Sequence, residues 1–173
     1  MIALVQYATT AKFRDLRHNR LVRITAKVDY AVRAMVELAA SESDAPIAAE
    51  SIAHAQDIPV AFLVKILSDL RTARLVQSRR GATGGYVLDG DPAAVSVADV
   101  IRAVEGPLAD VRGTPPEDIS YPGSTVALRD VWLATRVALR QVLEQTTIAD
   151  IARGELPGNV TAALNQPGAD RRR

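Results

Sequence analysis

Residues 47–88 constrain the fold more than any other part of the chain, because two helical patterns and a glycine-rich pattern follow one another there. Residues 47–58 favour a short helix whose buried side includes Ile52 and Ala53. Asp57-Ile58-Pro59 then predicts a tight turn. Aspartate tolerates the left-handed backbone conformation, and proline suits the first position of a new helix because the amide hydrogen it lacks would be unpaired there.

A second helix is predicted from Pro59 onward. Its apolar residues recur at helical spacing and predict one inward-facing stripe, made of Phe62, Leu63, Ile66, Leu67 and Leu70. The residues between them are expected on the outer and flanking surface, among them Ala61, Val64 and Lys65.

The glycine-rich segment Gly81-Ala82-Thr83-Gly84-Gly85 lies between two predicted short strands, residues 75–80 and 86–88. A nucleotide-binding loop is disfavoured, because no Gly-Lys-Ser/Thr ending is present and no helix follows directly. Helix, turn, helix and hairpin in this order predict a winged helix-turn-helix, a DNA-binding arrangement. Arg79 and Arg80 would then grip phosphate or enter a minor groove. The alternative is an ordinary surface hairpin with two solvated arginines.

Several short motifs between about Val22 and Gly158 share the pattern of a known family. They are Arg23-Ile24-Thr25, Asp29-Tyr30-Ala31, Phe62-Leu63, Leu70-Arg71, the wing from Arg80 to Tyr86, Leu128-Arg129-Asp130-Val131-Trp132, and Thr146-Thr147-Ile148-Ala149-Asp150-Ile151. In these motifs the chain resembles the IscR/NsrR/CymR-type (BadM-type) bacterial winged helix-turn-helix transcription regulators. The resemblance implies a mainly α fold with a small β-hairpin wing, and a cytoplasmic, homodimeric repressor that binds a near-palindromic operator.

The resemblance also implies the residues that contact double-stranded DNA. These are Arg23, Thr25, Lys27 and Tyr30 near the first helix, Ala61, Val64 and Lys65 facing the bases, and Arg79, Arg80, Gly81, Thr83 and Gly84 in the wing. Ala61 or Val64 is suited to touch a thymine methyl group. Val64 stands where several relatives carry a polar base-reading residue, so we expect an operator sequence that differs from theirs. Arg74 stands where glycine usually ends the second helix, so we expect a strained or different cap.

The second half of the chain begins with a predicted capping box, Ser96-Val97-Ala98-Asp99, which opens a helix that stops at Gly106-Pro107. Residues 107–123 are rich in proline and glycine and predict an irregular loop. A second capping pattern at Thr147 predicts a closing helix over residues 147–152.

Residues 124–145 carry the longest helical pattern, and a helix of this length exceeds what a small winged domain needs for its own core. The resemblance implies that it packs against a second subunit, through Leu128, Val131, Trp132, Thr135, Leu139 and Val142. Alternatively, this stripe packs within one chain against the winged domain.

These patterns divide the chain into five parts: an N-terminal extension (1–21), a winged helix-turn-helix domain (22–106), a proline-rich effector-region loop (107–123), a dimerisation helix with its closing helix (124–156) and a disordered tail (157–173). The extension is no secretion signal, because its apolar run is short and its positive charges follow that run. It is interpreted as an artefact of start-site choice or as a basic arm that adds phosphate contacts.

The charge of the chain is unevenly distributed, although its net value is only +1. Residues 1–80 hold 12 Lys and Arg against 8 Asp and Glu, whereas residues 81–170 hold 6 against 12. This asymmetry favours a DNA-facing part joined to a part that faces elsewhere. No apolar run is long enough to span a membrane, so we expect a soluble protein.

The sequence contains no cysteine. Many relatives hold an iron–sulfur cluster through three cysteines in the segment that corresponds to residues 107–123, and such clusters need thiolate ligands. Asp29 alone cannot hold a cluster, and His18 and His54 are isolated, so we expect no cofactor and no metal. The remaining candidate regulators are a small-molecule effector or a partner enzyme, acting at residues 107–123 or the base of the long helix.

Catalysis is not expected, because no nucleophile–base arrangement, metal cluster or fitting nucleotide loop is present. The main alternative to a DNA-binding regulator is a winged-helix module that binds another protein.

Overall fold

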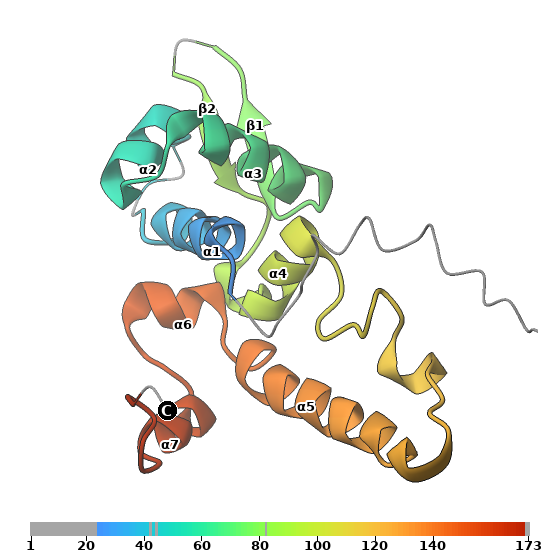
Figure 1. The fold of residues 1–173 in the computed structure, drawn as a ribbon. Coiled ribbons are helices and arrows are strands. Elements are labelled where there is room, and N and C mark those ends of the chain that lie inside the picture. The colour runs from blue at the N-terminus through green and yellow to red at the C-terminus, as the bar shows by residue number, and fades with distance from the viewer. Residues whose placement is uncertain (1–23, 42, 44, 82, 172–173) are drawn as a thin grey trace, which may run out of the picture.

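The computed structural model describes residues 24–41, 43, 45–81 and 83–171. It confirms a mainly helical chain with a single β-hairpin in this part (Figure 1). The helices are α1 (Ala26–Ala39), α2 (Ala49–Gln56), α3 (Val60–Thr72), α4 (Val97–Glu105), α5 (Leu128–Leu143), α6 (Ile148–Arg153) and α7 (Gly158–Leu164), and the strands are β1 (Val76–Arg79) and β2 (Gly85–Leu88). The predictions made for residues 1–21 and for Arg23 lie outside the described residues.

Helix α1 is the centre of the hydrophobic core. Met35 of α1, Ile52 of α2 and Leu67 of α3 are fully buried in one cluster. Val100 of α4 and Ile148 of α6 join the same cluster, so α1 lies between the helix-turn-helix and the second half of the chain (Figure 1). The two halves therefore share one core.

The turn between α2 and α3 forms at Asp57, as the sequence predicts. Asp57 has φ 50° and ψ 52°, a left-handed conformation, and the amide of buried Ile58 donates to the carbonyl of Ala53 at 2.9 Å. This bond closes the end of α2 in a Schellman arrangement. Helix α3 begins at Val60, one residue later than predicted. Pro59 therefore precedes the helix, and its carbonyl accepts from the amides of Phe62 and Leu63.

The predicted inward stripe of α3 is wrong at one position. Leu63, Ile66, Leu67 and Leu70 are buried, but Phe62 is 40% exposed. At 100° per residue Phe62 lies about 90° from the middle of the four buried positions, whereas each of those four lies within about 50° of it. Its ring instead forms a T-shaped pair with the ring of Tyr30 on α1, with 5.8 Å between ring centroids.

The β-hairpin is anchored to the segment before α2. Strands β1 and β2 are antiparallel, with Val76 opposite Leu88 and Arg79 opposite Gly85. Ile47 adds a further bridge to Tyr86, since its amide donates to the Tyr86 carbonyl at 3.0 Å and its carbonyl accepts from the Tyr86 amide at 2.8 Å. The base of the hairpin is thus fixed beside the helix-turn-helix.

Both predicted capping boxes are present. Ser96 caps α4 with Asp99, and Thr147 caps α6 with Asp150. Burial raises the pKa of Asp99, but the hydrogen bonds from Ser96 and the guanidinium group of Arg102 together outweigh this effect and hold the pKa below its usual value. The backbone and side-chain hydrogen bonds from Thr147 likewise lower the pKa of Asp150. Both carboxylates are therefore stabilised in the charged form that caps a helix.

The C-terminal part differs from the sequence prediction in two places. Helix α5 starts at Leu128 rather than at residue 124, because a short 3-10 turn, Gly123–Thr125, precedes it. The predicted disordered tail is wrong for Gly158–Leu164, which form α7, and Asn159 of α7 donates to the Gln141 carbonyl on α5. The loop 107–123 is irregular as expected, apart from 3-10 turns. Within the described residues, no helix is long and apolar enough to cross a membrane.

We expect Gly85→Ala to lower the free energy of unfolding by about 1–3 kcal/mol, because its Cβ would lie 2.4 Å from the Ile47 carbonyl oxygen. Chemical denaturation measures this. Gly158→Ala is the control, since an added Cβ there meets nothing within 4 Å. Equal stability of the two variants would contradict the close approach of Gly85 to residue 47.

Candidate DNA-binding interface

The predicted DNA-contacting segments gather at one end of the molecule. Figure 1 shows α2, α3 and the hairpin on one side of α1, with α5 on the opposite side. Helix α3 and strand β1 are separated by residues 73–75 alone. The helix and the hairpin that the sequence assigned to DNA are therefore neighbours in space as well as in sequence.

The exposed side of the first half of α3 is apolar apart from Lys65, and a second exposed cation, Arg71, lies in the last turn of the helix. Ala61, Val64 and Lys65 are all exposed, Val64 by 44%. Within the described part of the chain, no hydrogen bond or ion pair engages the ammonium group of Lys65. Val60 is exposed beside them, one turn before Val64. The sequence reasoning missed Val60, although its spacing of four from Val64 was the available signal.

The end of α3 fixes the direction in which the hairpin leaves. Arg74 adopts φ 59°, as expected of a residue where glycine is usual, and this left-handed conformation costs a non-glycine residue roughly 1–2 kcal/mol. The Leu75 amide donates to the Leu70 carbonyl at 2.9 Å, and the Arg74 amide donates to the Arg71 carbonyl at 3.0 Å. These two bonds form a Schellman cap that turns the chain into β1.

The tip of the hairpin depends on its glycines. Gly81 has φ 115°, and the Gly84 amide donates to the Gly81 carbonyl at 2.9 Å. A Cβ on Gly84 would lie 2.4 Å from the Arg79 carbonyl oxygen, so only glycine fits there. Arg79, Arg80, Gly81 and Thr83 are exposed, which leaves this tip open to solvent. Ala82 lies outside the described residues.

Two residues predicted to bind phosphate have partners inside the molecule. Thr25 caps α1, and its hydroxyl donates to the carboxylate of Glu105. The ammonium group of Lys27 lies 2.7 Å from the Asp69 carboxylate on α3 and donates to the Val104 carbonyl on α4 at 2.6 Å. The start of α1 is therefore joined both to α3 and to the last turn of α4. Nothing in the sequence pattern signalled these contacts.

Tyr30 lies at the border between α1 and the exposed face of α3. Its ring contacts Phe62, and the guanidinium carbon of Arg33 lies 5.5 Å from the centre of the same ring. Arg33 also pairs with exposed Asp29 at 3.2 Å, so this carboxylate has a local partner on the surface of α1. This aromatic and cationic group adds Arg33, which the sequence reasoning did not single out, to the candidate residues near the DNA.

Comparison with protein-family models gives a match over residues 24–154 to the Rrf2 family, which is described as an iron-dependent transcriptional regulator. The donor groups of this chain do not fit an iron–sulfur cluster, because the sequence contains no cysteine to supply thiolates. Among the residues that the structure describes, no three His, Asp or Glu side chains form a group able to hold a metal ion. We therefore assign no function through iron.

Named relatives agree with the family match. The chain is 51% identical over 139 residues to Rv1287 of Mycobacterium tuberculosis (strain ATCC 25618 / H37Rv), a candidate HTH-type transcriptional regulator, covering 80% of this chain and 86% of that protein. It is 37% identical over 131 residues to the HTH-type transcriptional regulator CymR of Bacillus subtilis (strain 168), covering 76% and 90%.

Solved structures show the same fold. CymR (YrzC), the global cysteine regulator of B. subtilis, superposes with a TM-score of 0.66 at 35% identity, covering 78% of this chain and 98% of that one. IscR of T. potens gives a TM-score of 0.63 at 31% identity, covering 76% and 87%. With its helix-turn-helix and glycine wing side by side, the chain belongs to the Rrf2 family and is a winged-helix, DNA-binding transcriptional regulator.

Proposed function

We propose that this regulator binds a near-palindromic operator as a homodimer and acts as a repressor, without an iron–sulfur cluster and without catalysis. The observation that carries the proposal is that two exposed surfaces lie at opposite ends of the molecule. The exposed face of α3 and the wing lie at one end, and α5 lies at the other with no buried residue (Figure 1). We assign repression because a protein that occupies promoter DNA blocks transcription unless it also makes an activating contact. It would act in the cytoplasm, where bacterial DNA lies.

The uncovered state of α5 supports dimerisation. Within one chain the helix buries none of its 16 residues, and Val131 is 52% exposed. The proposed interface consists of Leu128, Val131, Trp132, Thr135, Leu139 and Val142, of which Val131 and Val142 are exposed and the others half-buried. Burying such an apolar face against a second copy gains about 25 cal/mol per Å² of apolar surface. We therefore place the dimer axis beside α5.

A two-fold axis beside α5 turns the α3 helices of both subunits toward the same side of a duplex. Symmetric dimers of this kind read two related half-sites, separated by about one helical turn of DNA or a multiple of it. Ala61, Val64 and Lys65 of each subunit would face bases, and Val60 would lie beside them. The wing residues Arg79, Arg80, Gly81, Thr83 and Gly84 would contact phosphates or the adjacent minor groove.

Near α1, Tyr30 and Thr25 would lie close to the DNA backbone, and Arg23 would join them from outside the described residues. Lys27 would have a different role. Because its ammonium group is engaged with Asp69 and Val104, we assign it to positioning α3 rather than to phosphate binding.

A direct test is a fluorescence-anisotropy titration against DNA from upstream of the protein's own gene and against a scrambled duplex, at two salt concentrations. We expect tight, selective binding that weakens steeply with salt, because phosphate contacts release counterions. Lys65→Ala should weaken operator binding by about 1–3 kcal/mol, whereas Lys27→Met should keep the salt dependence of the wild type. Equally weak binding to both duplexes would contradict the proposal. A weaker dependence of binding on salt concentration for Lys27→Met than for the wild type would show that Lys27 contacts a phosphate.

The dimer face is tested by Val131→Glu. We expect sedimentation velocity to show a shift from dimer to monomer, because a carboxylate buried without a partner costs several kcal/mol. Val137→Glu is a matched control: Val137 lies on the same helix and is also 52% exposed, but about 120° away around the helix axis. If both variants dissociate equally, or if the wild type is a monomer, the assigned face is wrong.

The apolar face of α3 predicts that thymine methyl groups are read. Replacing single operator thymines with uracil removes the methyl group and keeps every hydrogen-bonding group. We expect a loss of about fourfold in affinity at the contacted position, from roughly 0.8 kcal/mol per buried methyl. In Val64→Ala the same replacement should matter less. Uniform tolerance of uracil at every position would show that α3 reads the operator by other groups.

A further inference from the structure

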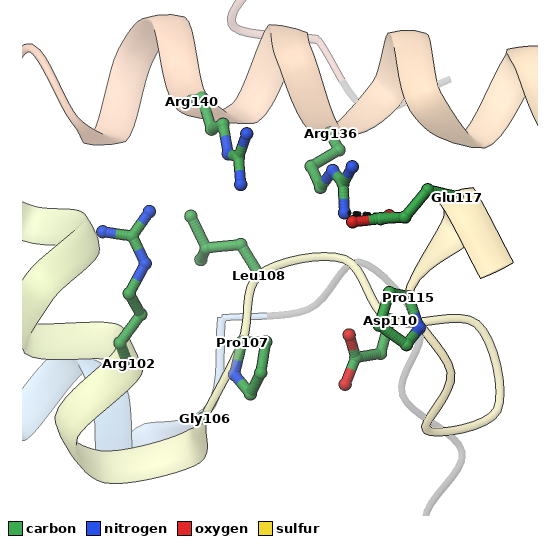
Figure 2. Close-up of a pocket in the computed structure, with 9 residues that line it drawn as sticks. All are labelled: Arg102, Gly106, Pro107, Leu108, Asp110, Pro115, Glu117, Arg136 and Arg140. Atoms are coloured by element: carbon green, nitrogen blue, oxygen red, sulfur yellow. Dashed lines mark ion pairs between the residues drawn. The ribbon is translucent and has the colours of Figure 1, made fainter.

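A cleft of about 500 Å³ lies between α4, the loop that follows it and α5 (Figure 2). This volume is within the usual range for small-molecule sites. Two walls carry arginines, Arg102 from α4 and Arg136 and Arg140 from α5. The third wall is the loop, which contributes Pro107, Leu108 and Pro115. Cationic groups therefore face an apolar wall across a space of ligand size.

The guanidinium groups are held in place around this space. Figure 2 shows those of Arg102 and Arg140 on either side of Leu108, both directed into the cleft. They share one carboxylate, that of Glu144, which pairs with Arg102 and lies 3.6 Å from the Nε atom of Arg140. Arg102 has a second partner in Asp99, whose other oxygen is occupied by the capping box of α4.

Arg136 is the most enclosed of the three. Its side chain is 15% exposed and lies 2.6 Å from the carboxylate of Glu117, which is itself 48% exposed on a 3-10 turn of the loop. The hydrogen bond from Arg136 lowers the pKa of Glu117, so this side chain stays a carboxylate. A sheltered guanidinium is thus paired with a carboxylate from a solvent-facing turn. A ligand carboxylate can take the place of Glu117, because a guanidinium group can offer two parallel donors to a carboxylate.

One acidic residue, Asp110, also lines the cleft. It limits the total charge that the cleft attracts, and it offers an acceptor for a hydroxyl or amino group on the ligand. The chemistry that fits all walls is a small organic acid: a carboxylate toward the arginines and a carbon skeleton against Pro107, Leu108 and Pro115.

The cleft is continuous with the contacts that position the DNA-reading helix. Gly106 and Pro107 line it, and they directly follow Val104 and Glu105. Val104 accepts from Lys27, and Glu105 accepts from Thr25. Lys27 also holds Asp69 of α3. A ligand in the cleft therefore lies within two residues of the atoms that join α4 to α1 and α3.

We propose that this cleft is an effector site for a small organic acid, whose carboxylate replaces Glu117 on Arg136, and that its occupancy alters operator affinity through the last turn of α4. The binding site stands on the cleft itself. Its regulatory consequence rests on the proposed function as an operator-binding dimer.

The test is isothermal titration calorimetry of the full chain with succinate, hexanoate and benzoate at millimolar concentrations, with inorganic phosphate at matched ionic strength. We expect saturable binding of at least one carboxylate and weaker binding of phosphate. Arg136→Gln should weaken carboxylate binding about tenfold or more, as expected for a lost charge-assisted hydrogen bond. Arg153→Gln is the matched control, an ion-paired arginine on α6 outside the cleft.

Arg140→Gln is a second variant in case Arg136→Gln does not fold. The side chain of Arg140 is 47% exposed, so its replacement should leave the fold intact, and it should also weaken carboxylate binding. Binding of none of the three carboxylates, or equal binding by wild type and both cleft variants, overturns the site. The calorimetry uses no DNA, so it decides the site even if operator binding fails. Anisotropy with and without the bound acid then decides the coupling: an unchanged operator affinity overturns the regulatory role and leaves the DNA-binding function standing.

Discussion

The packing of α1 against four other helices is the constraint on which the rest of the structure depends. Ala31 and Ala34 have no exposed surface, and these small side chains let neighbouring helices approach closely. The larger side chain of Met35, on the same helix, is also fully buried. Because α4 packs against both α1 and α3, any movement of α4 along α1 changes the surroundings of α3. Interiors of this density transmit displacements rather than absorb them.

The polar contacts at the start of α1 add direction to that packing. The pair between Lys27 and Asp69 is about one-third exposed, and such pairs contribute about 0–1 kcal/mol to stability. Its importance is therefore geometric, since one ammonium group fixes the distance between α3 and the Val104 carbonyl. A weak contact that orients α3, the helix proposed to read DNA, can be shifted by a ligand without unfolding the domain.

Sequence reasoning succeeded where the rule was local. The left-handed Asp57 and the capping boxes at Ser96 and Thr147 need only residues within a few positions of one another. Sequence reasoning failed for Phe62, because the helical periodicity of apolar residues does not tell which edge of the apolar stripe a neighbouring helix covers. It also failed for the partners of Lys27, which come from residues 42 and 77 positions away. Helix α7 was missed because its glycine, proline and asparagine content argued against regular structure.

The arginine cleft and the missing cysteines bear on the same question, how such a regulator receives a signal. The chain has no cysteine to supply the thiolates of an iron–sulfur cluster, and α4 is joined to the end of α5 by the ion pair between Arg102 and Glu144. A ligand shifts operator affinity only by its differential affinity for two arrangements of the protein. A tenfold change in operator affinity requires about 1.4 kcal/mol of such difference. One exchanged guanidinium–carboxylate contact is of that size, so the proposed effector needs no large conformational change to alter operator affinity.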